Sequence, residues 1–218
     1  MAARALTPAE AVAAVAAWAL LEAGLARALP RPPSPVAALG WTGAIRLGEL
    51  ALAAAWWRAR GFGAGRLGLG GAPARAGART GIAWALAFGA AAFGSEAIVR
   101  LATGHGWLGV LAGPRLAPDH LAWLLLVGAL VAPAFEELLF RGVLYGSFRD
   151  RWGPWPAVAG STAVFALAHL GTAAVPWTQV VGGVVFCLAY ERSGSLWAPY
   201  LVHAAGNACL FLLPWIVG

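Results

Sequence analysis

Six polar or ionisable side chains stand inside otherwise apolar stretches in the second half of the chain. They are Glu136, Glu137, Arg141, His169, His203 and Asn207. Ionisable groups inside apolar helices are costly and usually serve a function. Carboxylates and imidazoles around a wet cavity suit general acid–base chemistry, and an amide can donate a hydrogen bond to a developing oxyanion. These residue types therefore suit hydrolysis.

Helical spacing relates these side chains to one another. Three pairs are four residues apart: Glu137 and Arg141, Phe165 and His169, and His203 and Asn207. Residues four apart lie on one face of a helix, so Glu137 and Arg141 are expected to pair. Glu136 points about 100° away around the same helix. Its partner must therefore come from another helix, because a buried charge needs one.

The composition indicates what kind of elements carry these residues. The chain has 218 residues, of which 61% are hydrophobic and 11% are charged, and its mean hydropathy is +0.73. Soluble domains carry about a quarter of their residues as charged types, and disordered chains are poor in apolar residues. The two cysteines lie in apolar runs, which excludes a disulfide scaffold. The sequence predicts an all-α, polytopic transmembrane bundle forming a single integral membrane domain over 1–218.

About seven spanning helices are expected, each needing roughly 20 apolar residues. The apolar segments are Ala11–Leu29, Trp41–Trp57, Gly81–Leu101, His120–Phe148, Trp155–Leu170, Trp177–Tyr190 and Leu196–Val217. The long fourth segment should be bent or broken at Pro133, because proline disrupts a helix interior. An eighth helix is left open, either within this segment or in 104–117.

The arginines predict the orientation. All 15 basic residues are arginine, and the loop after the second segment holds five of them without an acid, which predicts a cytoplasmic loop. Alternation then places nine arginines inside (Arg4, Arg58, Arg60, Arg66, Arg75, Arg79, Arg149, Arg151, Arg192) and four outside (Arg27, Arg31, Arg100, Arg115). The N-terminus should be cytoplasmic. Because the arginines lie in short loops, a nucleic-acid partner is not expected. The lack of lysine suggests a GC-rich prokaryotic source, so the expected location is a prokaryotic cell membrane.

The same topology predicts the depth of the polar residues. At 1.5 Å per residue, Glu136 lies roughly 18 Å from the cytoplasmic end of its segment and His169 roughly 21 Å. His203 and Asn207 lie roughly 12 and 18 Å from theirs. Comparable depths indicate that the four groups can form one site.

The motifs resemble those of a known family of intramembrane proteases, the CAAX prenyl protease and bacteriocin-processing (CPBP) family. Its EExxxR motif matches Glu136, Glu137 and Arg141, its FxxxH motif matches Phe165 and His169, and its HxxxN motif matches His203 and Asn207, after the stretch YERSGSLWAP. The resemblance covers about Ala132 to Ala208. It implies an all-helical membrane endopeptidase with catalytic core helices in 118–216, and leaves the role of the helices in 1–117 unassigned.

The resemblance also implies roles for the six residues. Glu136 would be the general base with His169 as its partner, and His203 and Asn207 would donate to the oxyanion. Glu137 and Arg141 would shape the site. The expected partners are a peptide or protein substrate, lipidated (CAAX-type) or bacteriocin-like, and membrane lipid.

Metal dependence is left open between no cofactor and one zinc ion. Two histidines and one glutamate with an open position also form a catalytic zinc pattern. In that case Glu136, His169 and His203 would be the ligands and Glu137 the base. The metal-free mechanism is slightly favoured, because Asn207 is an unusual zinc ligand and Glu136 beside His169 can activate water unaided.

Other functions are less well supported by the residues. Asp119 and Asp150 lie at segment ends rather than as a mid-membrane aspartyl pair, Ser161 has no serine-protease turn around it, and no HExxH motif occurs. A non-catalytic scaffold or bacteriocin-immunity-type protein on the same fold is the main alternative. A proton-coupled transporter using Glu136 and the histidines is disfavoured, because paired repeats with broken helices are not evident.

Overall fold

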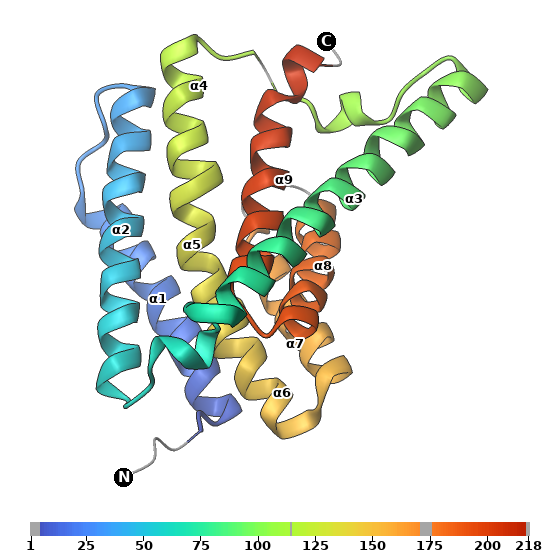
Figure 1. Ribbon diagram of the computed structural model, residues 1–218. Helices are drawn as coiled ribbons and strands as arrows, with labels where there is room; N and C mark the ends of the chain where they lie inside the picture. Colours follow the sequence, from blue (N-terminus) through green and yellow to red (C-terminus); the bar gives the residue numbers. More distant parts are fainter. Residues whose placement is uncertain (1–4, 114, 171–175, 217–218) are drawn as a thin grey trace.

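The computed structural model describes residues 5–113, 115–170 and 176–216, and these ranges contain helices and no β-strand (Figure 1). The helices form seven rods within them. The rods are α1 (Pro8–Ala28), α2 (Pro35–Ala59), α3 (Gly71–Thr103), a composite fourth rod (Pro118–Trp152), α7 (Pro154–Leu167), α8 (Trp177–Ser193) and α9 (Trp197–Ile216). The predicted all-helical bundle of about seven segments is confirmed.

Five helical stretches of the described chain are long and apolar enough to cross a membrane. They are Pro8–Ala28, Pro35–Ala59, Ala64–Thr103, Pro118–Trp152 and Trp197–Ile216. The remaining rods α7 and α8 have 14 and 17 residues, fewer than the roughly 20 that a bilayer needs. Large apolar side chains such as Leu20, Leu86 and Leu101 are exposed on the outer faces. An apolar exterior of this kind is stable in lipid, as expected for an integral membrane protein.

Local signals explain where the rods begin and end. The Thr7 side chain accepts from the Glu10 N–H at 3.2 Å while Glu10 accepts from the Thr7 N–H at 2.8 Å, a capping box that starts α1. Ser34 accepts from the Ala37 N–H at 3.1 Å and starts α2. At the other end of a helix, Gly194 adopts a left-handed conformation with φ of +64° and terminates α8.

The fourth rod was expected to be bent or broken at Pro133, and the structure shows no break there. It runs through α4 (Pro118–Leu124), the π-helical η3 (Leu125–Val131), α5 (Ala132–Glu137), the π-helical η4 (Leu138–Tyr145) and α6 (Gly146–Trp152). In η3 the Ala132 N–H donates to the Val127 carbonyl, five residues earlier. This wider turn makes room for the proline ring, which would clash with a regular α-helical turn.

No eighth spanning helix is present in the described residues. The described part of 104–117 holds only η2 (Leu108–Leu111), a 3₁₀ turn of four residues.

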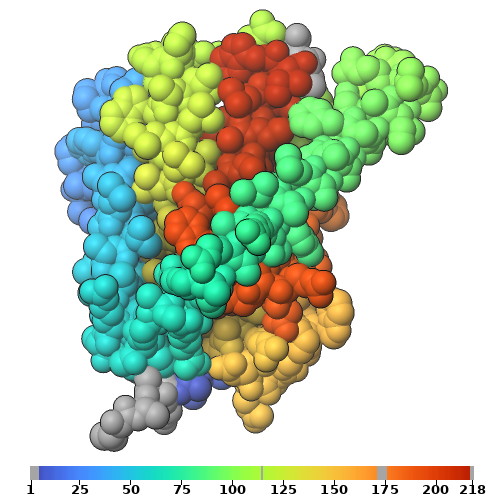
Figure 2. All heavy atoms as spheres, in the orientation of Figure 1, coloured from blue at the N-terminus to red at the C-terminus, as the bar shows by residue number. Residues whose placement is uncertain are grey.

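The fourth rod is the centre of the bundle (Figure 1). The helices α1 and α2 pack on one side of it, while α7, α8 and α9 lie on the other. Buried apolar side chains such as Phe135, Leu139, Val143 and Phe165 form the core around α5 and η4. The helix α3 crosses α9 and α8 on the outside, and its C-terminal half extends away from the bundle (Figure 2).

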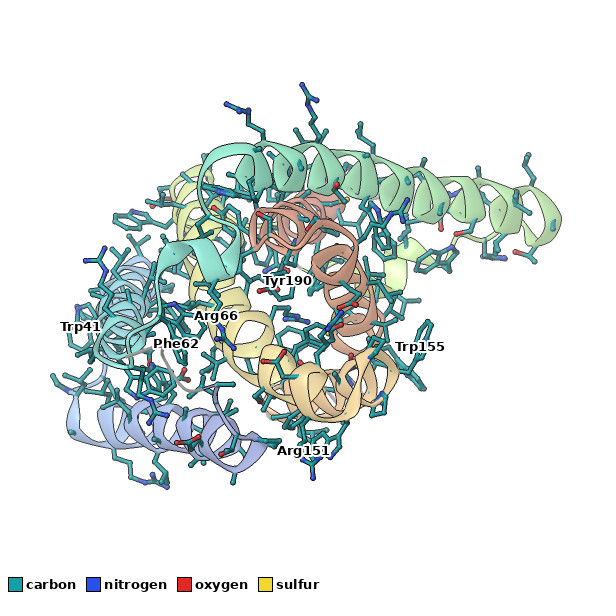
Figure 3. The ribbon with its side chains drawn as sticks, turned by 60° about the horizontal axis from the view of Figure 1, so that its bottom comes forward. Trp41, Phe62, Arg66, Arg151, Trp155 and Tyr190 are labelled. Carbon is teal, nitrogen blue, oxygen red and sulfur yellow. The ribbon has the colours of Figure 1, made fainter. Side chains whose placement is uncertain are left out.

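The connections after α2 and after α6 lie at the end of the bundle where α1 begins (Figure 1), with Arg66 and Arg151 at this arginine-rich end (Figure 3). Arg75 and Arg79, which were expected in the loop after the second segment, lie instead in α3. Ion pairs join Arg60 to Glu10 at 2.9 Å, Arg66 to Asp150 at 3.1 Å and Arg149 to Glu191 at 2.9 Å. The chain leaves α9 at the opposite end, as expected for an odd number of rods. The side of the membrane that each end faces stays a prediction, and Arg4 lies outside the described residues.

Gly68 joins the turn η1 (Ala64–Leu67) to the α8–α9 link, and its replacement is expected to destabilise the fold. Its φ is +62°, and a Cβ there would lie 2.2 Å from the Gly194 carbonyl oxygen. Gly68→Ala should therefore lower the free energy of unfolding by about 1–3 kcal/mol. Gly65→Ala in the same turn is the control, because its Cβ meets no atom within 4 Å. Thermal unfolding in detergent, followed by tryptophan fluorescence, measures the difference, and equal midpoints would contradict it.

Candidate active site

Four of the six predicted side chains line one cavity of about 860 Å³, a size typical of ligand-binding sites. They are Glu136, His169, His203 and Asn207. Glu136 comes from α5, His169 from the turn directly after α7, and His203 and Asn207 from α9. Three rods that are distant along the chain therefore bring a carboxylate, two imidazoles and an amide to one hollow. Glu137 and Arg141 lie behind its wall, with 1% and 0% of their side chains exposed.

Glu137 connects Arg141 to His203. Arg141 Nη1 donates to Glu137 Oε1 at 3.0 Å, so the predicted ion pair is present. His203 Nδ1 lies 2.7 Å from the same oxygen. Because an ionised carboxylate only accepts, His203 Nδ1 carries the proton and donates it to this hydrogen bond. Glu137 therefore fixes the orientation of the His203 ring, as carboxylates commonly do for functional imidazoles.

Two phenylalanines enclose the buried part of this network. The Arg141 guanidinium lies 4.6 Å from the Phe165 ring centroid and 4.9 Å from that of Phe186. The His203 ring stacks on Phe186, with centroids 4.5 Å apart and planes 16° from parallel. Cation–π and stacking contacts in a desolvated environment hold both polar groups in place. Phe186 is not part of any motif, and nothing in the sequence distinguishes it from the other apolar residues of its segment.

Glu136 occupies a different environment from its neighbour in the chain. It lines the cavity and 16% of its side chain is exposed. Its Oε2 lies 3.8 Å from His203 Nε2, so this neighbouring polar group comes from another helix, as the spacing predicts. This distance is too long for a direct hydrogen bond. Of the two adjacent carboxylates, Glu137 is sequestered and Glu136 faces the cavity.

His169 is held by the end of its own helix. Its Nδ1 lies 2.8 Å from the Phe165 carbonyl oxygen, four residues earlier. A carbonyl only accepts, so Nδ1 bears a proton and donates it to this hydrogen bond. The ring also packs on Phe165, with centroids 4.7 Å apart, which is the contact predicted by their spacing.

Asn207 hydrogen-bonds to the irregular part of the fourth rod. Its Nδ2 donates to the Gly128 carbonyl at 2.9 Å. In the π-helical pattern of η3 the donor for this carbonyl would be residue 133, which is a proline without an N–H. Asn207 satisfies the carbonyl that Pro133 leaves unpaired, so it anchors α9 to the fourth rod and also lines the cavity.

The alternative zinc site has no preformed ligand set. Among the described residues, no three histidine, cysteine, aspartate or glutamate side chains are close enough to hold one ion. This includes Glu136, His169 and His203. The residues as placed do not fit a metal centre.

Part of the cavity wall comes from segments of the chain that the polar pattern did not indicate. Apolar residues and a glycine of α3 (Ala85, Phe88, Gly89, Ala92, Phe93) and of the η2 region (Trp107, Leu108, Val110, Leu111) line it. Apolar residues of a membrane helix have no sequence signal that separates a cavity wall from a lipid-facing surface. Only the packing of α3 across α8 and α9 identifies them.

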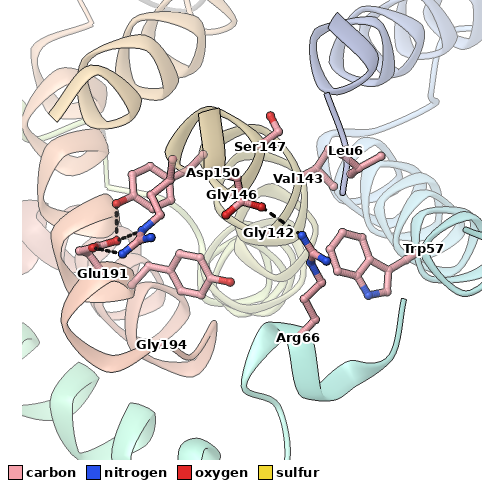
Figure 4. Close-up of a pocket in the computed structure, with 13 residues that line it drawn as sticks. Leu6, Trp57, Arg66, Gly142, Val143, Gly146, Ser147, Asp150, Glu191 and Gly194 are labelled. Atoms are coloured by element: carbon pink, nitrogen blue, oxygen red, sulfur yellow. Dashed lines mark hydrogen bonds and ion pairs between the residues drawn. The ribbon is translucent and has the colours of Figure 1, made fainter. Parts of the chain in front are cut away.

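A second, smaller pocket of about 410 Å³ lies at the arginine-rich end of the bundle (Figure 4). Its charged residues are paired with one another: Arg66 with Asp150, and both Arg149 and the Tyr145 hydroxyl with Glu191. None of the six predicted site residues lines it. These contacts join the η1, η4, α6 and α8 residues at this end of the bundle.

Comparison with known proteins matches the part of the chain that carries the site. The family described as "Type II CAAX prenyl endopeptidase Rce1-like" matches residues 118–209. A Bacillus subtilis (strain 168) protein named "Putative membrane peptidase YdiL" is 22% identical over 90 residues, which cover 41% of this chain and 36% of that protein. An Escherichia coli protein named "Uncharacterized 24.3 kDa protein" is 34% identical over 93 residues, covering 39% of this chain and 41% of that one.

The resemblance drawn from the three motifs is thus confirmed for residues 118–209. At the level of the family, the match is to a CAAX-type membrane protease. The aligned region spans less than half the length of each of these two relatives. No solved structure matches the chain.

Proposed function

We propose that the chain is an intramembrane endopeptidase that hydrolyses a peptide bond with a water molecule activated by Glu136. The observation that carries the proposal is the gathering of Glu136, His169, His203 and Asn207 around one cavity inside an apolar helical bundle. The family match of residues 118–209 supports the same class of reaction.

In the proposed reaction, Glu136 holds a water molecule beside the scissile carbonyl, with His169 as its partner. Glu136 takes a proton from the water as the oxygen attacks the carbonyl carbon. The former carbonyl oxygen becomes an oxyanion and accepts hydrogen bonds from His203 Nε2–H and from the Asn207 amide. The carbon–nitrogen bond then breaks, and Glu136 returns the proton to the leaving amine. His203 must carry protons on both ring nitrogens for this role, since Nδ1 already donates to Glu137.

Glu137 and Arg141 act as positioning residues in this proposal. They do not reach the cavity surface, but they hold His203 through a single carboxylate oxygen. The stacked Phe186 and the edge of Phe165 keep water away from this support. No step of the reaction uses a metal ion.

The proposed substrate is a peptide or membrane-associated protein whose apolar part lies in the bilayer. Lipidated CAAX-type proteins and bacteriocin-like peptides are the two candidate classes. The proposed setting is a prokaryotic cell membrane with the arginine-rich end in the cytoplasm.

The proposal is tested by comparing cells that express the wild type with cells that express Glu136→Gln. Uncut membrane-associated peptides should accumulate in the variant and be absent with the wild type, as detected by mass spectrometry of the membrane fraction. Equal peptide profiles, together with an unimpaired cellular phenotype in the variant, would instead support the non-catalytic scaffold on the same fold.

A further inference from the structure

The segment that follows α3 forms part of the cavity wall. We call residues 105–111 the strap. Trp107, Leu108, Val110 and Leu111 of the strap line the cavity, together with the α3 residues named above. The strap and α3 lie outside the region 118–209 that matches the protease family. The polar residues of the cavity therefore come from the family-like part of the chain, whereas its apolar lining comes from both parts.

Glu96 clasps the strap to α3. Its Oε2 accepts from the Trp107 N–H at 2.7 Å and from the Leu108 N–H at 2.8 Å. Arg100 Nη2 donates to the other oxygen, Oε1, at 2.7 Å. The Glu96 side chain is only 8% exposed, and Leu108 is buried beside it. Charge-assisted hydrogen bonds to two successive backbone N–H groups fix the position of the strap.

Gly106 permits this arrangement because a side chain at its position would displace the Glu96–Arg100 pair. A Cβ there would lie 1.7 Å from Glu96 Oε1 and 2.6 Å from Arg100 Nη2. Gly109, three residues later in the same strap, has no atom within 4 Å of the corresponding position. The strap thus contains one glycine that the clasp requires and one that it does not.

We propose that the strap, held by Glu96, is the specificity-determining wall of the active-site cavity. It sets the width of the cavity on the α3 side and so selects the apolar group of the substrate that lies next to the scissile bond. The identity of this occupant rests on the proposed function, whereas the position of the wall does not. An apolar occupant follows from continuity: the same cavity runs from Glu136 and His203 to the strap, and its strap end is lined by aromatic and aliphatic side chains.

The wall can be tested without any catalytic assay, because Cys209 of α9 lines the same cavity. The other cysteine, Cys187, is fully buried. We would measure the alkylation rate of Cys209 in the purified full chain with N-ethylmaleimide and with the larger pyrenylmaleimide, following the Cys209 peptide by mass spectrometry. In Gly106→Ala the new Cβ overlaps Glu96 and Arg100 only while the strap is bound to Glu96, so the substitution favours release of the strap. Release opens the cavity to the larger reagent, and the reaction of Cys209 with pyrenylmaleimide should become about tenfold faster. Gly109→Ala should react at the wild-type rate.

A second variant guards against misfolding of the first. Glu96→Gln keeps the side-chain shape but replaces one accepting oxygen by an NH₂ group, which weakens the hydrogen bonds that hold the strap. It should therefore also accelerate the labelling of Cys209. Wild-type labelling rates in both Gly106→Ala and Glu96→Gln would overturn the proposal.

Substrate selection is tested with peptides that carry small or large apolar residues next to the cleaved bond of a substrate found as described above. Leu111→Ala widens the cavity next to the strap. The KM for the peptide with the large residue should therefore fall by about tenfold relative to the KM for the peptide with the small residue, with kcat unchanged. Leu101→Ala is the control, because Leu101 is exposed and does not line the cavity. An unchanged preference overturns the selective role of the strap. Absence of cleavage by the wild type would refute the proposed protease function. The Cys209 labelling would still show whether the strap forms a wall of the cavity.

Discussion

Glu136→Gln is expected to reduce kcat/KM for peptide cleavage by about 10²–10⁴-fold, the usual contribution of a general base. Glutamine has nearly the same shape as glutamate and can still orient a water molecule, but it cannot take a proton from it. Glu136 is the carboxylate that faces the cavity, whereas Glu137 is buried behind it. The rate is measured with the purified protein in detergent, by mass spectrometry of the released fragments.

The fold should be unaffected by this substitution. Glu136 makes no direct hydrogen bond to His203 across 3.8 Å, so the thermal unfolding midpoint of Glu136→Gln should match the wild type. The control is Asp119→Asn, the same chemical change near the start of the same rod, at a side chain that is 67% exposed. Cleavage by Glu136→Gln at more than a tenth of the wild-type rate would show that another group is the base.

Arg141→Met is expected to lower the free energy of unfolding by about 3–5 kcal/mol, the cost of breaking a buried ion pair from one side. Methionine is apolar and of similar length, so it replaces much of the packing between Phe165 and Phe186. It leaves the Glu137 carboxylate buried with His203 as its remaining hydrogen-bond partner within the described structure. Chemical unfolding in detergent micelles, followed by tryptophan fluorescence, measures the loss.

Two further variants separate the buried charge from simple packing. Glu137→Gln combined with Arg141→Met removes both charges and should recover most of the lost stability, because a buried pair is often replaceable by neutral residues. Arg149→Met removes the same kind of side chain from the exposed pair with Glu191 and should cost no more than about 1 kcal/mol. Equal losses for Arg141→Met and Arg149→Met would contradict the interpretation.

The roles of Glu136 and Glu137 were predicted from a motif resemblance. Their different environments, in contrast, depend on how the helices pack together. The spacing alone predicted that Glu137 pairs with Arg141, since i and i+4 side chains meet on a helix. It also predicted that Glu136 needs a partner from another helix. That this partner is His203, and that the same ring is held by Glu137, follows only from the way α9 packs against α5.

The fourth rod shows where local rules fail. Proline in a helix interior usually breaks or kinks it, and a bend or break at Pro133 was expected. The rod accommodates the proline with a π-helical turn, and Asn207 from α9 supplies the missing donor to Gly128. A residue 79 positions later in the chain compensates for the proline, so no local sequence rule could have predicted the continuous helix.

Hydropathy and short-range spacing alone determined the helical class, the approximate bounds of the rods and the three pairs of polar or aromatic residues four positions apart. These properties depend on neighbours within a few residues, which the order of residues specifies directly. Tertiary structure determines the cavity, the burial of Glu137, the exposure of Glu136 to the cavity, and the position of the strap. They depend on which apolar faces meet, and in a membrane helix an apolar residue looks the same whether it faces lipid, a neighbouring rod or a substrate.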